Sequence, residues 1–338
     1  MGTWLFLRSA HPSVRERTKQ PPSRNLSKND DMWTVWFNTL THKAGVRGII
    51  LRVGNSYRVD FNQHLSEIRL PELHCLGGLN DVTLCINRGG YREYMPLVNL
   101  LRRSVRHAYI GCGTRYNPVD AEWMQSINFN LVWVDSPSQQ ETLNELFKSH
   151  VFPKPTVERI FKSIRCPKKY DLVFVCRTPK EFKGCKWLAE RVPSGSSVLY
   201  IGDGDPWFER EFADERIQGK ITGRVERKDI PALACQALMG VVCDEGKKDS
   251  GPRVFSEFLA MNLPVIVRSC VRIDHHRCIN EKSGVIVGER VNDLGDAMTI
   301  IKHRLAKGKL APREVYDKNM SIDVSTDEFL NEVDAFRK

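Results

Sequence analysis

Short apolar runs of strand length alternate with helical patterns along the sequence, and this alternation restricts the possible folds more than any other feature. Residues 82–86 (VTLCI) are typical of the strand-like runs. The stretches between such runs place apolar residues three and four positions apart, as one face of a helix requires. Alternating strands and helices predict parallel sheets that are covered by helices on both faces.

The alternation occurs in two series, which Pro153 and Pro155 separate. The first series predicts strands at 3–8, 48–54, 82–87, 106–110 and 130–135, and helices at 31–44, 91–104, 118–126 and 138–149. The second predicts strands at 171–176, 197–202, near 220, 239–243, 264–267 and 284–287, and helices at 183–191, 229–237, 252–261, 291–306 and 325–337. The 338 residues also suffice for two domains.

We therefore predict an α/β protein of two Rossmann-like, doubly wound domains that face each other across a cleft. The N-terminal domain is expected over 1–155 and the C-terminal domain over 156–322. A last helix over 323–338 is expected to pack back toward the N-terminal domain.

Charge and cysteine usage restrict the partners and the compartment. The net charge of +10 at pH 7 indicates a polyanionic partner, either nucleic acid or an anionic membrane surface. No run approaches the roughly 20 apolar residues that span a bilayer, and the start does not resemble a signal peptide.

The ten cysteines form no Cys-x-x-Cys pair, so we expect a reducing cytoplasm. His275 and His276 are adjacent, with no second ligand cluster, so we expect no metal site there.

The most informative stretch is residues 249–267 (DSGPRVFSEFLAMNLPVIV). Gly251 and Pro252 suit a helix start, whose free N–H groups attract an anion. Arg253 adds a cation that opposes the helix dipole unless a phosphate lies between them. Glu257, one turn on, can accept hydrogen bonds from ribose hydroxyls, or it is simply a solvated acid on an amphipathic helix. Asp249 can reach sugar hydroxyls.

Two acids eight positions apart, followed by a helix, Leu-Pro and an apolar strand, resemble the signature of retaining glycosyltransferases of family 4, which have the GT-B fold. That family usually has Glu where this chain has Asp249. The resemblance implies that Asp249 lies near the donor sugar, residues 251–253 near the diphosphate, and Glu257 on the nucleotide ribose. It implies a nucleotide-sugar donor in the C-terminal domain, with a UDP-sugar expected first and no strict requirement for a metal.

Two flanking segments resemble the same family in order. Arg177 and Lys183, the latter followed by glycine, resemble an Arg and Lys-Gly pair that holds the donor diphosphate, although Lys180 is a rival for the second position. Two cations there can neutralise the departing diphosphate. Gly223 matches the Thr-Gly end of a strand, although a strand-end glycine often marks only a turn. The predicted catalytic residues are therefore Asp249, Arg177 and Lys183, and the predicted donor-binding residues are Glu257, Gly251, Pro252, Arg253, Gly223, Gly111, Thr114 and Arg115.

Basic residues gather in two segments of the N-terminal half. Residues 8–28 and 88–115 hold twelve of the eighteen basic residues in 1–150 but only two of its thirteen acids. Both begin at the end of a predicted strand, and such clusters suit phosphate contacts on nucleic acid. Trp33, Trp36 or Tyr91 could stack on a base, although we expect the predicted helix 31–44 to bury at least one of its tryptophans. The predicted nucleic-acid contacts are Arg8, Arg15, Arg17, Lys19, Arg24, Arg88 and Arg92.

Our leading hypothesis is transfer of a hexose or pentose to a hydroxymethylated pyrimidine in double-stranded DNA, as in virus-encoded DNA glucosyltransferases of the same fold class. Such an enzyme flips its target base out of the duplex, and a viral protein would work in the host cytoplasm. One alternative is a saccharide or lipid-linked acceptor at an anionic membrane. Another is a nucleic-acid-binding protein that has lost catalysis. We expect a monomer or a homodimer.

Overall fold

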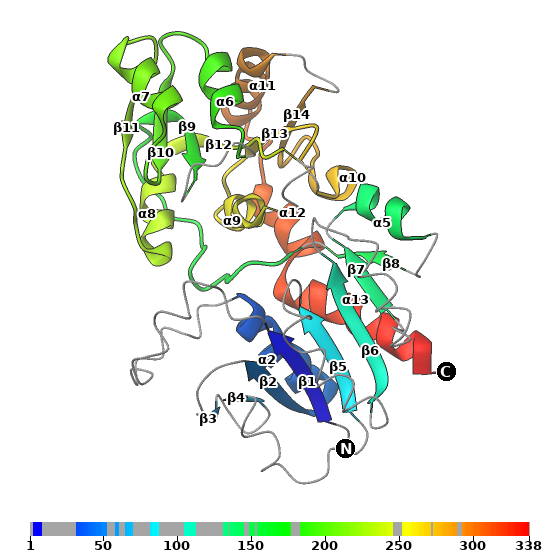
Figure 1. Ribbon diagram of the computed structural model, residues 1–338. Helices are drawn as coiled ribbons and strands as arrows, with labels where there is room; N and C mark the ends of the chain where they lie inside the picture. Colours follow the sequence, from blue (N-terminus) through cyan, green and yellow to red (C-terminus); the bar gives the residue numbers. More distant parts are fainter. Residues whose placement is uncertain are drawn as a thin grey trace. The chain divides into compact units, whose positions relative to one another are not determined.

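The computed structural model describes residues 3–8, 32–52, 58–60, 65–69, 82–87, 105–112, 131–134, 136–144, 149–152, 154–176, 183–245, 252–271, 273–288 and 293–337. The chain divides into two compact units (Figure 1). The first unit comprises 1–134, 138–152 and 326–338, and the second comprises 135–137 and 153–325. The first unit is therefore discontinuous in sequence, since it takes in the end of the last helix.

The first unit contains an eight-stranded sheet. From edge to edge its strands are β3 (Arg58–Asp60), β4 (Leu65–Arg69), β2 (Arg47–Arg52), β1 (Thr3–Arg8), β5 (Val82–Asn87), β6 (Val105–Cys112), β7 (Leu131–Val134) and β8 (Ser149–Val151). Neighbouring strands are parallel except for β3, which runs antiparallel to β4. Because parallel neighbours need crossover connections, this sheet is of the doubly wound kind that the sequence predicted.

Aromatic side chains form the core of the first unit. Phe6 of β1 stacks on Phe37 of α2 (Met32–Ala44), with ring centroids 3.9 Å apart. Phe329 of α13 (Ile322–Arg337) lies edge-on to Trp133 of β7 at 5.2 Å and to Trp36 of α2 at 5.3 Å. The suggested stacking of Trp36 on a base is wrong, because its ring is fully buried in this core.

The second unit contains a six-stranded sheet in which every neighbouring pair is parallel. From edge to edge its strands are β11 (Gln218–Ile221), β10 (Ser197–Ile201), β9 (Tyr170–Val175), β12 (Ala237–Val242), β13 (Val265–Arg268) and β14 (Gly284–Val287). Numbered within the unit, this order is 3-2-1-4-5-6, which is the Rossmann arrangement. The direction of winding reverses between β9 and β12.

Helices cover both faces of this second sheet. On one face α6 (Cys185–Arg191), α7 (Pro206–Ala213) and α11 (Leu294–Ala306) pack against Leu172 and Phe174 of β9. On the other face α8 (Ile230–Ala234), α9 (Arg253–Ala260) and α12 (Pro312–Asn319) pack against Val173 and its neighbours. Successive side chains of a strand point to opposite faces, so an apolar strand such as β9 serves both layers.

Several predicted boundaries are wrong. The helix predicted at 138–149 is α5 (Pro137–Asn144), and Ser149 already belongs to β8. The helix predicted at 229–237 is shorter, because Ala237 begins β12. Helix α7 was not predicted from the sequence, although Asp205 caps it by accepting hydrogen bonds from the backbone N–H groups of Trp207 and Phe208 at 3.0 and 3.2 Å. Asp followed by Pro was an available signal for that helix start.

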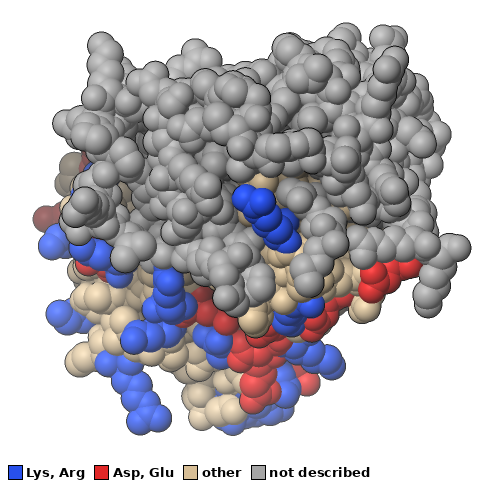
Figure 2. All heavy atoms as spheres, turned by 90° about the horizontal axis from the view of Figure 1, so that it is seen from below, with Lys and Arg blue, Asp and Glu red and all other residues tan. Residues whose placement is uncertain are grey.

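The described surface is mixed in charge. On the face shown in Figure 2, the described Lys and Arg side chains lie interspersed with Asp and Glu side chains. Ile164 and Leu305 are the large apolar residues that the described surface exposes, at 37% and 41%. None of the helices in the described part of the chain is both long and apolar enough to cross a membrane.

Candidate functional site

The strand order of the second unit locates the candidate site before any side chain is considered. In open parallel sheets, ligands bind outside the carboxyl ends of the strands, where the strand order reverses. Here that point lies where β9 and β12 end, at Val175 and Val242. The residues that follow these two strands therefore border the expected ligand site.

An ion pair occupies this switch point. Lys183, just before α6, donates from Nζ to Oδ1 of Asp244, which follows β12 by two residues. The Asp244 side chain is 5% exposed and that of Lys183 is 26% exposed. Lys183 was predicted from the sequence, whereas Asp244 was missed. The structure thus places a partly accessible cation, with a buried counter-ion, where a Rossmann-type unit binds its ligand.

A glycine brings the two segments together. Gly184 lies between Lys183 and α6 and has a φ of +71°, in the left-handed region. A Cβ at this position would overlap the backbone carbonyl of Cys243, so the start of α6 can approach the end of β12 only because residue 184 has no side chain. The Lys-Gly sequence therefore has a local structural reason: glycine allows the close approach, and lysine is placed at the strand ends.

The neighbouring strands end in glycines as well. Gly202 and Gly223, which follow β10 and β11, form an isolated bridge to each other. A Cβ at Gly202 would overlap the carbonyl oxygen of Cys176 at the end of β9. Gly223 has a φ of +70° and open space around its Cα. Gly223 thus lies, like Lys183, at the carboxyl ends of the strands, where the chain turns.

Glu257 is buried, so its interpretation as a solvated surface acid is wrong. Its side chain is 8% exposed, and Oε1 accepts a hydrogen bond from Nη2 of Arg227 at 2.8 Å. Arg227 begins the short 3-10 helix η4 (Arg227–Asp229). Its guanidinium also lies over the ring of Phe161, 4.9 Å from the ring centroid. Arg227 gave no signal in the sequence, because only the fold brings it to Glu257.

The helix that carries Glu257 starts as predicted to within one residue. Pro252 takes the capping position and is buried, and Arg253 is the first residue of α9 and is exposed. Arg253 therefore places a cation in the first turn of α9, as predicted from the sequence.

Two other predicted residues, Gly111 and Arg8, are described only through the strands that contain them. Gly111 belongs to β6, beside Trp133 of β7, and Arg8 ends β1. The predicted residues that lie outside the described residues are Asp249, Gly251, Arg177, Lys180, Thr114, Arg115, Arg15, Arg17, Lys19, Arg24, Arg88, Arg92 and Tyr91.

The sequence matches no protein-family model and no curated protein. The structure, in contrast, is similar to solved structures. It aligns with sucrose-phosphate synthase from Thermosynechococcus elongatus at a TM-score of 0.66, with 14% identity over 98% of both chains. It aligns with HepE from Anabaena, solved with UDP and glucose, at 0.63, with 10% identity over 99% of this chain and 100% of that one. A glycosyltransferase from Rickettsia africae gives 0.63 and 13% identity over 100% and 99%.

The chain has the GT-B fold. This confirms the fold class predicted from the alternating pattern and from the motifs around Glu257. At 10% to 14% identity the likeness concerns the fold, so the roles of single residues depend on the site itself.

Buried thiols lie close to the candidate site of this GT-B protein. Burial raises the pKa of Cys243 well above its ordinary value. A hydrogen bond with Cys176, together with burial, raises the pKa of Cys185 as well. Both thiols therefore stay neutral at physiological pH, so neither is a thiolate nucleophile. Both are buried in the core of the second unit, and Sγ of Cys243 lies 3.5 Å from the backbone carbonyl oxygens of Lys183 and Gly184.

The described part of the chain contains no cluster of three His, Cys, Asp or Glu side chains that could hold a metal ion. His275 and His276 lie in a short helix, α10 (His275–Cys278). A ring nitrogen of His275, Nε2, lies 2.7 Å from the carbonyl oxygen of Val271. His275 is thus engaged with the backbone of the preceding turn.

Proposed function

We propose that the protein is a glycosyltransferase that transfers a sugar from a nucleotide-sugar donor, first of all a UDP-sugar, to an acceptor hydroxyl. The observation that carries the proposal is the ion pair of Lys183 with Asp244 at the switch point of a Rossmann sheet in a GT-B chain. The solved structures with the same fold support the donor class, because HepE was solved with UDP and glucose.

The proposed chemistry assigns roles by charge. In the transfer, the bond between the anomeric carbon and the diphosphate breaks, and the electron pair leaves with the nucleoside diphosphate. The acceptor oxygen forms the new bond to that carbon, and its proton passes to an oxygen of the departing diphosphate. Lys183, with Arg177, would neutralise the charge that develops on the departing diphosphate. The buried carboxylate of Asp244 would hold the Lys183 ammonium at the strand ends until the donor binds.

Further donor contacts follow from the motif around α9. We assign the donor-sugar hydroxyls to Asp249, the diphosphate to the backbone at Gly251 and Pro252 with Arg253, and the nucleotide ribose to Glu257. In line with the family that the motif resembles, we propose that the anomeric configuration of the sugar is retained. The first unit would then bind the acceptor.

For the acceptor, we propose a hydroxymethylated pyrimidine in DNA. The net charge of +10 and the two basic segments, 8–28 and 88–115, support this choice because they suit phosphate contacts. A saccharide or lipid-linked hydroxyl is the second candidate. It is favoured by the likeness to sucrose-phosphate synthase, whose name describes a saccharide product.

The first experiment tests the donor reaction. Purified protein is incubated with a panel of nucleotide sugars, and release of nucleoside diphosphate is followed by chromatography. We expect one UDP-sugar to be consumed, and we expect Lys183→Met to slow its consumption about 100- to 1,000-fold, as loss of one transition-state donor does elsewhere. Lys186→Met is the matched control, because Lys186 lies three residues further on, in α6, and its side chain is 57% exposed, where it pairs with Glu190 and lies over the ring of Trp207. Equal activity of the two variants would contradict the proposal.

The second experiment identifies the acceptor. DNA that contains hydroxymethylcytosine or hydroxymethyluracil, a set of oligosaccharides, and lipid-linked saccharides in anionic vesicles are each offered with the donor. A hexose- or pentose-sized mass gain on the modified nucleoside supports the DNA acceptor. A gain on a saccharide or lipid instead moves the proposal to the second candidate. Salt-sensitive DNA binding without any donor turnover would indicate a nucleic-acid-binding protein that has lost catalysis.

A further inference from the structure

We propose that Arg227 is a positioning residue, which orients the carboxylate of Glu257 toward the donor ribose and so makes the site prefer ribonucleotides over deoxyribonucleotides. This inference rests on the proposed function. It adds a residue that neither the motifs nor the comparisons point to. Arg227 and Glu257 are thirty positions apart in the sequence and meet only because η4 and α9 lie together in the fold.

Three contacts from two segments of the chain, 156–161 and α9, hold the guanidinium of Arg227. Nη2 donates to Oε1 of Glu257 at 2.8 Å and lies 3.4 Å from Oγ1 of Thr156. The guanidinium plane also lies over the ring of Phe161 at 4.9 Å. A planar group that is fixed from several sides also fixes the carboxylate it binds, since a charge-assisted bond is short and directional. The conformation of Glu257 is therefore determined by Arg227.

The pairing leaves Glu257 able to serve a ligand. An ionised carboxylate has two oxygens and about four lone-pair sites, so it can accept from a ribose while Oε1 is engaged with Arg227. The carboxylate is almost fully buried, and its charge-assisted hydrogen bond to Arg227 fixes the direction in which it points. A carboxylate that has lost this bond is no longer held in the rotamer that accepts from the ribose. Loss of Arg227 should therefore remove ribose recognition even though Glu257 is still present.

The location of Arg227 fits this role. η4 begins four residues after Gly223, so the segment that turns at the carboxyl end of β11 also delivers Arg227. Glu257 lies in the helix that follows β12. The pair therefore joins the segment that follows β11 to the helix that follows β12. Both leave the sheet at the carboxyl ends of its strands, where the strand order predicts ligand binding.

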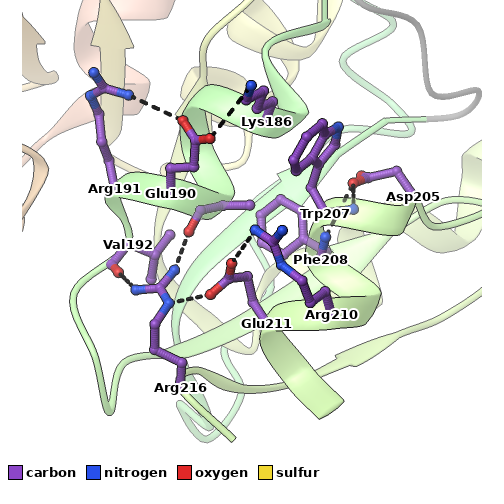
Figure 3. Close-up of polar contacts among 11 residues, drawn as sticks. Lys186, Glu190, Arg191, Val192, Asp205, Trp207, Phe208, Arg210, Glu211 and Arg216 are labelled. Atoms are coloured by element: carbon purple, nitrogen blue, oxygen red, sulfur yellow. Dashed lines mark hydrogen bonds and ion pairs between the residues drawn. The ribbon is translucent and has the colours of Figure 1, made fainter. Parts of the chain in front are cut away.

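A second ion pair in the same unit provides a matched control. Arg216 binds Glu211 through Nε, and the two side chains are 29% and 9% exposed (Figure 3). The exposed fractions of the Arg227 and Glu257 side chains are nearly the same, at 28% and 8%. Glu211 belongs to α7, which packs on the opposite face of the sheet from α9. Replacing Arg216 therefore breaks a similarly buried pair without touching Glu257.

The test measures binding of UDP and of 2′,3′-dideoxy-UDP to the full chain by isothermal titration calorimetry. A hydrogen bond to a charged group is worth a factor of about 10 to 100, so the wild type should prefer UDP by that factor. In Arg227→Met we expect the preference to fall below about threefold, while affinity for the dideoxy nucleotide stays within about twofold. Arg227→Lys should restore part of the preference, and Arg216→Met should keep all of it. Glu257→Gln, which preserves the shape of the side chain, should lose the preference as Arg227→Met does.

The outcomes separate the two proposals. If Arg227→Met retains the wild-type preference, whatever Glu257→Gln does, or if it weakens both nucleotides equally, Arg227 has only a structural role and the inference is overturned. A wild type that consumes a UDP-sugar but binds UDP and dideoxy-UDP equally overturns the inference and leaves the proposed function intact. A wild type that binds neither nucleotide and consumes no donor overturns the proposed function and the inference with it.

Discussion

Replacing Phe329 with alanine should destabilise the first unit while leaving the second unit folded. The Phe329 side chain is 2% exposed. Its ring lies edge-on to four others, with centroid distances of 5.2 Å to Trp133, 5.3 Å to Trp36, 6.1 Å to Trp4 and 6.5 Å to Phe152. All four neighbours belong to the first unit. The substitution therefore removes the ring at the centre of an aromatic cluster.

The magnitude follows from this packing. Truncation of a buried phenylalanine to alanine costs about 3–5 kcal/mol, and the cost is highest where the cavity cannot collapse. Here the cavity walls are rigid rings, and each edge-to-face pair that is lost adds to the cost of burial alone. We expect about 4–5 kcal/mol for Phe329→Ala. For a unit of this size, that corresponds to a fall in melting temperature of roughly 8–20 °C.

Thermal unfolding combined with hydrogen exchange and mass spectrometry measures this effect unit by unit. In Phe329→Ala, exchange should rise in peptides that contain β1 and β7, while β9 and β10 stay protected. Phe208→Ala is the converse control, because Phe208 is fully buried in the second unit against Phe174 and Tyr200. A Phe329→Ala variant that lost less than about 1 kcal/mol, or that opened both units equally, would refute the reasoning.

Three further predictions concern the second unit. Gly184→Ala should abolish donor turnover while the protein stays folded, because the new methyl group would push the start of α6 away from the carbonyl of Cys243; turnover at the wild-type rate would contradict this. A hydrogen bond from Arg216 holds the pKa of Glu211 below its ordinary value, so the stabilisation that this pair provides is present above about pH 4.3 and lost as pH falls through the lower, folded-state pKa. The gap in melting temperature between wild type and Arg216→Met should therefore be largest at neutral pH and narrow toward about pH 3, and a constant gap would count against the assignment. Iodoacetamide should alkylate Cys270, which is exposed, in the native protein but reach Cys243 only after unfolding, as peptide mass spectrometry can show.

Most strands of the second unit were predicted well because most of their residues are buried, whereas the exposed β11 was predicted only as a strand near 220. The strand predicted at 284–287 coincides with β14, all four residues of which are buried. Such strands are continuous apolar runs, which a sequence displays directly. Helix α12 was missed for the opposite reason. Its sequence, PREVYDKN, is polar, and among its residues Pro312, Val315 and Tyr316 are buried. Its contact with α9 stabilises a helix that its own periodicity does not reveal.

The residues of the candidate site also differ in how far the sequence predicts them. Lys183 could be predicted because the Lys-Gly sequence is local, and a local requirement for glycine leaves a local signature. Asp244 and Arg227 could not be predicted, since their partners lie 61 and 30 positions away in the sequence. Trp36 shows the reverse error: an aromatic residue near basic segments suggested base stacking, but its α-helix buries it in an aromatic core.

The return of α13 to the first unit has a consequence for synthesis of the protein on the ribosome. Residues 153–325 form one uninterrupted stretch and can complete their core while translation continues. The first unit is translated earlier, but its aromatic cluster lacks a member until Phe329 emerges, after the whole of the second unit has been made. Domains usually fold in the order in which they are synthesised. For this chain we expect the reverse order of completion, because the rings of Trp36 and Trp133 can meet Phe329 only after the whole second unit has been synthesised.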